Sequence, residues 1–358
     1  MRTSVAGFRR GIVAGVAVGL LAGCAGPEPG DRSGPSPTPT PTPSDERTGT
    51  TGTPAGSASP GPTTPTPTGP LGPATPATPA TPTSPAASTT PARPPSFDPA
   101  AAFATVRTLA GLGPRETTSR AYRRAAAHVE RRLAALGYRV SRQAVDVPAG
   151  NSWGIDVPAG VADNLLAVPD GFDADAPHRV VGAHLDTVPQ APGAEDNASG
   201  VAVLLELARM AAEAPPEVPV TFVVFAAEEP RGEGDDWHHF GSQHYVRQLD
   251  RRERDAVVGM VAVDRVGAGR GVRIRAGDRG PRSVLRQLAA AAGRVGVAHT
   301  GGESTASDHW SFQKAGIAAA RLGGTAYAGY HNADDVPDGL RRATLDANGR
   351  VAWAWLTS

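Results

Sequence analysis

Histidine and carboxylate side chains stand directly after apolar, strand-like runs in this chain. His184 and Asp186 follow the run 179–183, and the two-residue period of a strand places both on the same side. A histidine that binds a metal commonly has a carboxylate partner that fixes its tautomer and orientation. Asp196 lies twelve residues beyond His184, at the start of the next predicted helix. Taken alone, Asp196 would be interpreted as a helix N-cap, so its role depends on its neighbours.

The most apolar run of the chain, 218–227, ends in two adjacent glutamates, Glu228 and Glu229. Carboxylates at the end of such a strand are not a solvated charge run. Where the chain turns, the two side chains can diverge, one toward a metal and the other toward a water molecule. Asp264 follows the next apolar run, and His331 lies downstream of the last one. Together these oxygen and nitrogen donors indicate one shared site at the strand ends.

The elements that must position these donors alternate between helix and strand along 97–358. Such alternation predicts a three-layer α/β/α sandwich with a mostly parallel central sheet. Ligands of such sheets bind beyond the carboxyl ends of the strands, so we expect the chemistry just after 183, 227, 263 and 322. The predicted strands are 138–147, 161–168, 179–183, 218–227, 257–263 and 317–322, and the predicted helices are 98–112, 119–136, 198–214, 242–249, 282–295 and 340–356.

Six motifs, taken in order, resemble the aminopeptidase S/aminopeptidase Y family of secreted di-zinc exopeptidases. The resemblance spans nearly all of 97–358. A lone His-x-Asp is a weak signal, but the ordered set is specific. The motifs are H-L-D at 184–186, G-A-E-D-N-A-S-G at 193–200, A-E-E at 227–229, V-D-R-V-G at 263–267, S-D-H-W-S-F at 307–312 and G-Y-H-N-A-D-D at 329–335.

The resemblance implies two zinc ions per chain that share Asp196 as a bridging ligand. His184 and Asp264 would complete one zinc site, and Glu229 and His331 would complete the other. Oxygen ligands mixed with imidazole suit zinc. Two close cations would lower the pKa of a bound water and polarise a peptide carbonyl.

The resemblance also implies roles for three residues beside the metals. Glu228 would be the general base that takes a proton from the water and passes it to the leaving amine. Tyr330 would donate a hydrogen bond to the oxyanion that develops on the peptide carbonyl. Asp186 would support the His184 ligand.

Two departures from the usual family pattern concern the surroundings of the site. The loop 230–239 is longer and more charged than the short hydrophobic turn common in relatives, and Arg265 stands where an apolar residue is more often seen. Both are expected to alter substrate preference, and neither removes a ligand. His238 and His239 in the loop are predicted to be exposed or to lie at the rim of the substrate site.

The remaining histidines carry weaker signals. His309 follows Ser307 and Asp308, but the chain has no G-x-S-x-G nucleophile motif. The start of a pocket-lining helix is therefore favoured over a serine-hydrolase triad. The others are interpreted as surface or packing residues: His128, His178, His244 and His299.

The N-terminus has the pattern of a bacterial lipoprotein signal. A cationic start is followed by an apolar run too short to span a bilayer, and Leu21-Ala-Gly-Cys24 resembles a lipobox. We therefore predict a signal peptide over 1–23, lipidation of Cys24 and an extracytoplasmic protein that is anchored to the membrane or secreted.

A spacer is predicted to follow the lipidated cysteine. Residues 27–95 hold 21 of the 35 prolines and no aromatic residue, so they cannot bury enough apolar surface to fold. We predict a disordered linker over 24–96 and a single catalytic domain over 97–358, which is long enough for one sizeable core.

Charge and cysteine content exclude several classes of protein. The 35 acidic and 35 basic residues balance, which argues against nucleic-acid binding, and the single cysteine excludes a disulfide framework. The leading hypothesis is a monomeric aminopeptidase acting on peptides with a free N-terminus. The alternatives are a glutaminyl cyclase needing one zinc, a carboxypeptidase in which Arg265 binds a terminal carboxylate, and a catalytically silent peptide-binding lipoprotein. The presence of Glu228 argues against the last.

Overall fold

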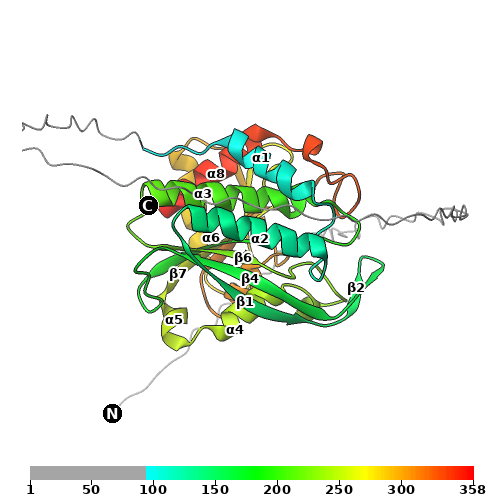
Figure 1. Ribbon diagram of the computed structural model, residues 1–358. Helices are drawn as coiled ribbons and strands as arrows, with labels where there is room; N and C mark the ends of the chain where they lie inside the picture. Colours follow the sequence, from blue (N-terminus) through cyan, green and yellow to red (C-terminus); the bar gives the residue numbers. More distant parts are fainter. Residues whose placement is uncertain (1–93) are drawn as a thin grey trace, which may run out of the picture. The chain divides into compact units, whose positions relative to one another are not determined.

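The computed structural model describes residues 94–358, which build a central sheet with helices on both faces (Figure 1). The eight strands of this sheet are β1 (Arg139–Val147), β4 (Gly160–Val168), β5 (His178–His184), β6 (Val220–Phe225), β7 (Val257–Asp264), β8 (Val272–Ala276), β9 (His299–Glu303) and β10 (Ala319–Gly323). Their order across the sheet is β1-β4-β6-β5-β7-β10-β8-β9. The predicted three-layer fold is confirmed.

The four central strands β6, β5, β7 and β10 run parallel, and the outer strands β4 and β8 pair antiparallel to them. All six residues of β6 are buried, as expected of a central strand covered on both faces. In the parallel register His184 pairs with Phe225, and Gly323 pairs with Asp264. The carboxyl ends of the central strands therefore meet at one edge of the sheet, where the predicted site residues stand.

The helices divide into two layers, one on each face of the sheet (Figure 1). One layer holds α1 (Pro99–Ala110), α2 (Arg120–Ala135), α3 (Gly200–Glu213), α6 (Ser283–Arg294) and α8 (Arg342–Leu356). The other holds α4 (Phe240–Gln248), α5 (Arg251–Ala256) and α7 (His309–Lys314). None of the helices within 94–358 is long and apolar enough to cross a bilayer.

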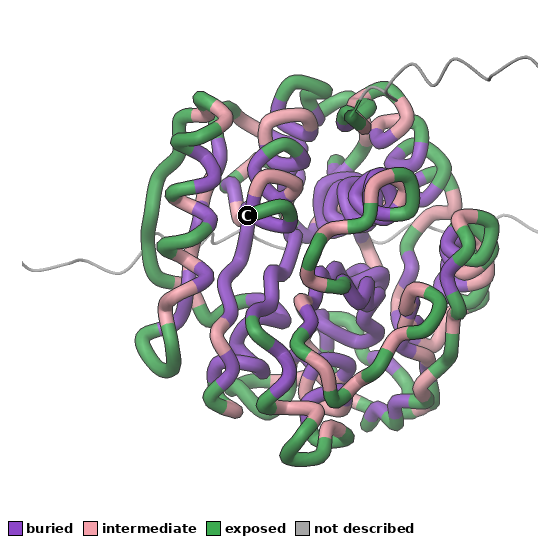
Figure 2. Tube along the Cα trace, turned by 90° about the vertical axis from the view of Figure 1, so that its left-hand side faces the viewer, coloured by how far each residue is buried: buried purple, intermediate pink, exposed green. Residues whose placement is uncertain are grey.

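Amphipathic patterning explains how these helices pack. The buried residues of α2 recur at helical spacing, and its arginines face solvent: the buried set is Tyr122, Ala125, Ala126, Val129 and Leu133. Buried positions gather in the sheet and on the inward faces of the helices (Figure 2).

The predicted elements agree with the observed ones to within a few residues, but several short elements were not predicted. These are β8, β9, α5 and a separate hairpin of β2 (Gly150–Ser152) and β3 (Ile155–Val157). Strand β9 is exposed along its whole length and has the sequence HTGGE, so it carries no hydrophobic period. Helix α5 is short and polar, and a capping box marks its N-terminus.

The predicted signal peptide, Cys24 and nearly all of the predicted linker lie outside the described residues. At the start of the described part, Phe97 is buried against Gly349 of α8. The backbone oxygen of Ser96 accepts a hydrogen bond from Arg209 at 2.7 Å. Ser96 and Phe97 thus contact α3 and α8 of the described domain.

Candidate metal centre

Five predicted ligands come together at the carboxyl edge of the sheet, in two groups that share Asp196. In the first group, His184 Nε2 lies 3.1 Å from Asp196 Oδ1 and 3.9 Å from Asp264 Oδ1. In the second group, His331 Nε2 lies 3.3 Å from Asp196 Oδ2 and 3.3 Å from Glu229 Oε2. Each of the two carboxylate oxygens of Asp196 therefore faces a different group.

The chemistry of these atoms fits a cation between them. Within residues 94–358, His184 Nε2 and Glu229 Oε1 are buried without a hydrogen-bond partner. Buried polar atoms normally have a hydrogen-bond partner. Neighbouring imidazole and carboxylate groups whose lone pairs lack one are suited to bind a metal ion. Tetrahedral zinc ligands at 2.0–2.2 Å from the ion lie roughly 3.3–3.6 Å apart, close to the separations seen here.

Asp196 belongs to a segment that differs from the prediction. It was expected at the start of the helix over 198–214, but a kinked turn, Ala194–Ser199, precedes α3, and Asp196 has non-helical backbone angles (φ −111°, ψ 91°) within it. The carboxylate of Asp335 accepts hydrogen bonds from the backbone N–H groups of Glu195, at 2.7 Å, and of Asp196, at 3.1 Å. Asp335 thus holds the backbone of this turn in place, and the side chain of Asp196 is left facing both histidines.

Asp186 supports the two adjacent glutamates as well as His184. Its Oδ1 accepts the backbone N–H of Glu228, and its Oδ2 accepts that of Glu229, both at 3.1 Å. The His184 Nδ1 lies 3.2 Å from the backbone oxygen of Asp186, closer than the 3.7 Å to its carboxylate. A carbonyl oxygen can only accept a hydrogen bond, so Nδ1 carries the proton, and the lone pair of Nε2 faces the candidate metal site.

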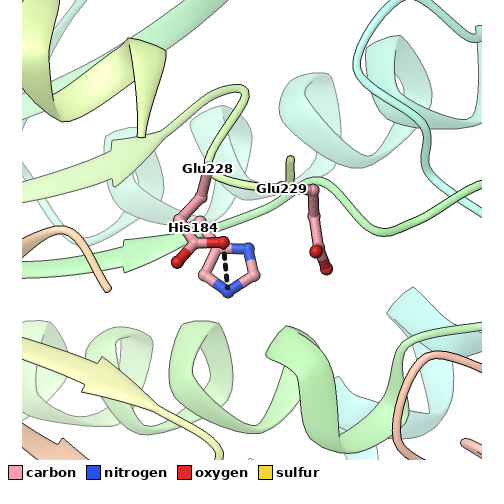
Figure 3. A group of neighbouring side chains, drawn as sticks. All are labelled: His184, Glu228 and Glu229. Carbon is pink, nitrogen blue, oxygen red and sulfur yellow. Dashed lines mark ion pairs between the residues drawn. The ribbon is translucent and has the colours of Figure 1, made fainter. Parts of the chain in front are cut away.

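Glu228 and Glu229 diverge from the end of the strand that precedes them, as predicted (Figure 3). Glu229 belongs to the second group, whereas Glu228 Oε2 lies 3.9 Å from His184 Nε2. On its other side, Glu228 Oε1 lies 3.3 Å from His239 Nε2. Burial raises the pKa of the Glu228 carboxyl to about 7. A carboxyl whose pKa lies near neutrality can both accept and return a proton.

His239 was predicted to be exposed or at the rim of the substrate site. It is buried, so the expectation of exposure is wrong, although it does line the cleft beside the candidate ligands. Burial lowers its pKa, which favours a neutral ring beside Glu228. His238 lies next to it in the same cleft and is only partly buried.

The His309 prediction is confirmed in its structural part, because this residue is the first of α7. Its Nε2 donates to the backbone oxygen of Ser304 at 2.9 Å. Of the four histidines interpreted as surface or packing residues, His178 is buried and packs edge-on against Phe172. None of these five belongs to a group of possible metal ligands among the described residues.

The mouth of the cleft carries aromatic side chains from distant segments. Tyr330 stacks on the ring of His331, with centroids 3.7 Å apart. Trp153, at the tip of the β2–β3 hairpin, lies edge-on to His331 at 4.5 Å and is 55% exposed. Trp153 carries no functional signal in the sequence, because nothing in the neighbouring residues shows that the hairpin reaches the site.

The backbone around the cleft is strained. Five non-glycine residues of the described chain have left-handed φ values: Trp153, Ala227, His239, Arg265 and His331. Four of them line the cleft, and the fifth, Ala227, directly precedes Glu228. Residues in this conformation persist only where the surrounding structure holds them, and they cluster at functional sites. The strained residues therefore lie in the same region as the candidate ligands.

The chain is similar to known proteins in sequence and in fold. The family model described as "Peptidase family M28" matches residues 164–356. The uncharacterized protein YfbL of Escherichia coli is 34% identical over 152 residues, which are 40% of this chain and 42% of that protein. Aminopeptidase YwaD of Bacillus subtilis is 34% identical over 169 residues, 45% of this chain and 35% of that protein. The chain thus spans less than half the length of these curated relatives.

A shorter match links the chain to a protein of Mycobacterium tuberculosis described as the probable lipoprotein aminopeptidase LpqL. The two are 42% identical over 72 residues, which are 20% of this chain and 13% of that protein.

Solved structures share the fold. A zinc aminopeptidase from Bacillus subtilis superposes with a TM-score of 0.65 at 18% identity, covering 74% of this chain and 95% of that one. The glutaminyl cyclase of Bacteroides thetaiotaomicron superposes with a TM-score of 0.62 at 21% identity, covering 74% and 99%. At this identity the similarity concerns the fold alone. Because the family model matches residues 164–356, more than half of the sequence, the chain belongs to peptidase family M28.

Proposed function

We propose that this protein is an aminopeptidase that holds two zinc ions and hydrolyses the N-terminal peptide bond of its substrates. The observation that carries the proposal is the pair of ligand groups that share Asp196. One group would hold a zinc ion with His184 and Asp264, and the other with Glu229 and His331. The zinc ions would supply Lewis acidity and an acidified water.

The protein's own residues would position and move the proton. Glu228 lies beside the ligand groups, and the backbone N–H that it donates to Asp186 fixes the start of its side chain. Its buried carboxyl would accept a proton from the attacking water and transfer it to the leaving amine. Tyr330 lies at the cleft, where its hydroxyl would donate a hydrogen bond to the developing oxyanion.

Glutaminyl cyclase activity is the second candidate, because solved structures with this fold include such enzymes. A cyclase needs one zinc and releases ammonia from an N-terminal glutamine. The complete second ligand group with Glu229 and His331 favours the two-zinc hydrolase.

We further propose that the protein acts outside the cytoplasm, anchored through Cys24. The lipobox-like sequence and the similarity to a probable lipoprotein aminopeptidase support this location. Cys24→Ala should release the protein from the membrane fraction of the producing cells. Continued membrane association that only detergent breaks would refute the anchor.

The activity is tested with the full chain, zinc and a panel of peptides. Free N-termini should be required, so Leu-Ala-Ala should be cut and its N-acetyl form should not. Cyclisation of Gln-Ala-Ala without hydrolysis of the other peptides would favour the cyclase. Binding of peptides without any turnover would favour a transport or sensing protein.

A further inference from the structure

A cationic side chain, that of Arg265, lies in the cleft beside the candidate ligands. The Arg265 guanidinium makes no side-chain hydrogen bond to any residue in 94–358, although its side chain is only 14% exposed. Its Nε lies 3.9 Å from both Asp196 Oδ2 and Asp264 Oδ1, beyond hydrogen-bonding distance. A buried arginine usually satisfies its donors, so these donors are available to a ligand.

The surrounding chain fixes the position of this guanidinium. Arg265 has a left-handed φ of 58°, its N–H donates to Asn197 Oδ1 at 3.2 Å, and its carbonyl accepts from Gly324 at 3.1 Å. The Tyr330 ring lies 4.4 Å from the guanidinium carbon and supports its plane. Glycine would adopt this backbone conformation with less strain, so the backbone gives no reason for an arginine. The side chain itself must supply the reason.

A second guanidinium lines the same cleft from the sheet. Arg321, on β10, is 2% exposed, and its Nη2 forms an ion pair with Asp264 Oδ1 at 3.0 Å. Its other terminal nitrogen donates to the backbone oxygen of Ala306 at 2.5 Å, so its orientation is fixed. The Arg321 Nε has no hydrogen-bond partner in the described chain.

The net charge of the cleft lining would change sign if two divalent cations were bound there. Four carboxylates line the cleft, from Asp196, Glu228, Glu229 and Asp264. Two divalent cations would balance them, and the two guanidinium groups would then leave the loaded cleft positive. The cleft is small, about 80 Å³, so the positive charge lies close to any peptide bond placed at the metals.

We propose that Arg265 binds a substrate carboxylate close to the scissile bond, with Arg321 adding positive charge behind it. The inference rests on the proposed peptidase function and deepens it by naming the substrate class. The planar fork of arginine matches a carboxylate bidentately, which a lysine cannot reproduce. The carboxylate can be the C-terminus of a dipeptide or the side chain of an aspartate or glutamate. Both sources share the chemistry that the cleft recognises.

The test compares matched substrates that differ only in this charge. Comparing the hydrolysis of Ala-Ala with that of Ala-Ala-amide tests whether a C-terminal carboxylate is recognised. Two further comparisons test whether an acidic side chain is recognised on either side of the bond: Glu-Ala-amide with Gln-Ala-amide, and Ala-Glu-amide with Ala-Gln-amide. In at least one pair the acid should have a kcat/KM higher by about 10- to 100-fold, the value of a hydrogen bond between charged groups.

Substitutions test whether Arg265 causes the preference for the acidic substrate. Arg265→Met keeps the length of the side chain and removes its charge, so the acid-to-amide ratio should fall toward one. Arg265→Lys should restore only part of the ratio. Arg251→Met, at a side chain 94% exposed in α5, is the matched control and should keep the wild-type ratio. Zinc content and melting temperature show whether each variant is folded.

The outcomes separate this inference from the proposed function. Equal hydrolysis of acid and amide in all three pairs, or a preference that persists in folded Arg265→Met, overturns the carboxylate site and leaves the aminopeptidase intact. Cleavage of N-acetylated peptides with a free C-terminus supports the carboxylate site and overturns the aminopeptidase. If no peptide is cut, calorimetric binding of the same three acid and amide pairs decides: equal affinity within every pair refutes the site.

Discussion

The two adjacent glutamates should respond differently to removal, although they are neighbours in sequence. Glu229 Oε2 lies 3.3 Å from His331 Nε2, and its Oε1 has no partner among the described residues, as expected of a ligand. Glu228 contacts His239 at 3.3 Å and lies 3.9 Å from His184, as expected of a base that faces a water. The same geometry also permits His184, Glu228 and Glu229 to form a ligand group, so an experiment must decide.

The expected magnitudes follow from the two roles. Glu229→Ala should lower the zinc content from about two ions per chain toward one. At free zinc 100-fold above the dissociation constant, the lost ion removes about 2.7 kcal/mol of stability. For a domain of this size, that lowers the melting temperature by roughly 5–10 °C. Glu228→Ala should keep both ions and lose about 10²- to 10⁴-fold in rate, or roughly 3–5 kcal/mol of transition-state stabilisation.

Metal analysis, thermal melting and peptide hydrolysis on the purified variants provide the test. Glu233→Ala, at an exposed glutamate in the same loop, is the matched control and should behave as the wild type. Zinc loss from Glu228→Ala with retention in Glu229→Ala would reverse the two roles. If neither variant changes metal content or rate, the two-zinc peptidase proposal is wrong.

Three further changes probe the supports of the site. Asp186→Asn turns one acceptor oxygen into a donor, so it should cost about 1–3 kcal/mol in a denaturant melt and reduce the rate at least tenfold; wild-type values would refute its supporting role. Burial lowers the pKa of His309 to about 3 from 6.5. The unfolded chain therefore binds more protons between these values, and stability, complete above pH 6.5, falls as the pH drops toward 3, by up to about 1.4 kcal/mol per pH unit. His309→Gln should reduce that slope in urea melts at pH 4–7, and an unchanged slope would contradict the assignment. Gly150→Ala would bring a Cβ into the backbone oxygen of Arg231. The substitution should therefore displace the hairpin and lower both stability and rate, whereas a neutral effect would show that the hairpin can shift freely.

The predicted linker should contribute nothing to folding or catalysis. The protein shortened to 94–358 retains Ser96 and Phe97, which make the first packing contacts of the described chain. Its melting temperature and its rate on soluble peptides should equal those of the full chain. A loss of several degrees would mean that the preceding residues pack on the domain.

The sequence by itself determined the layers of the fold and the place of the candidate ligands. Strand β6 is buried at every position, and an unbroken apolar run of this length is readable without structure. Parallel connection then brings the strand ends to one edge, so donors such as His184, Glu229 and Asp264 are expected to meet there. The apolar strand pattern and the parallel sheet topology therefore both place the candidate ligands at this edge.

Only the tertiary structure decided what surrounds those donors. Trp153 and Arg321 reach the cleft from a hairpin and a strand whose sequences carry no chemical signal. The burial of His239 and the capture of two backbone N–H groups by Asp186 depend on how loops fold back onto the sheet. Such contacts join residues far apart in the chain, and hydrophobic periodicity reports only which face of an element is buried. Which side chain closes over a strand end is fixed by packing, which no local pattern encodes.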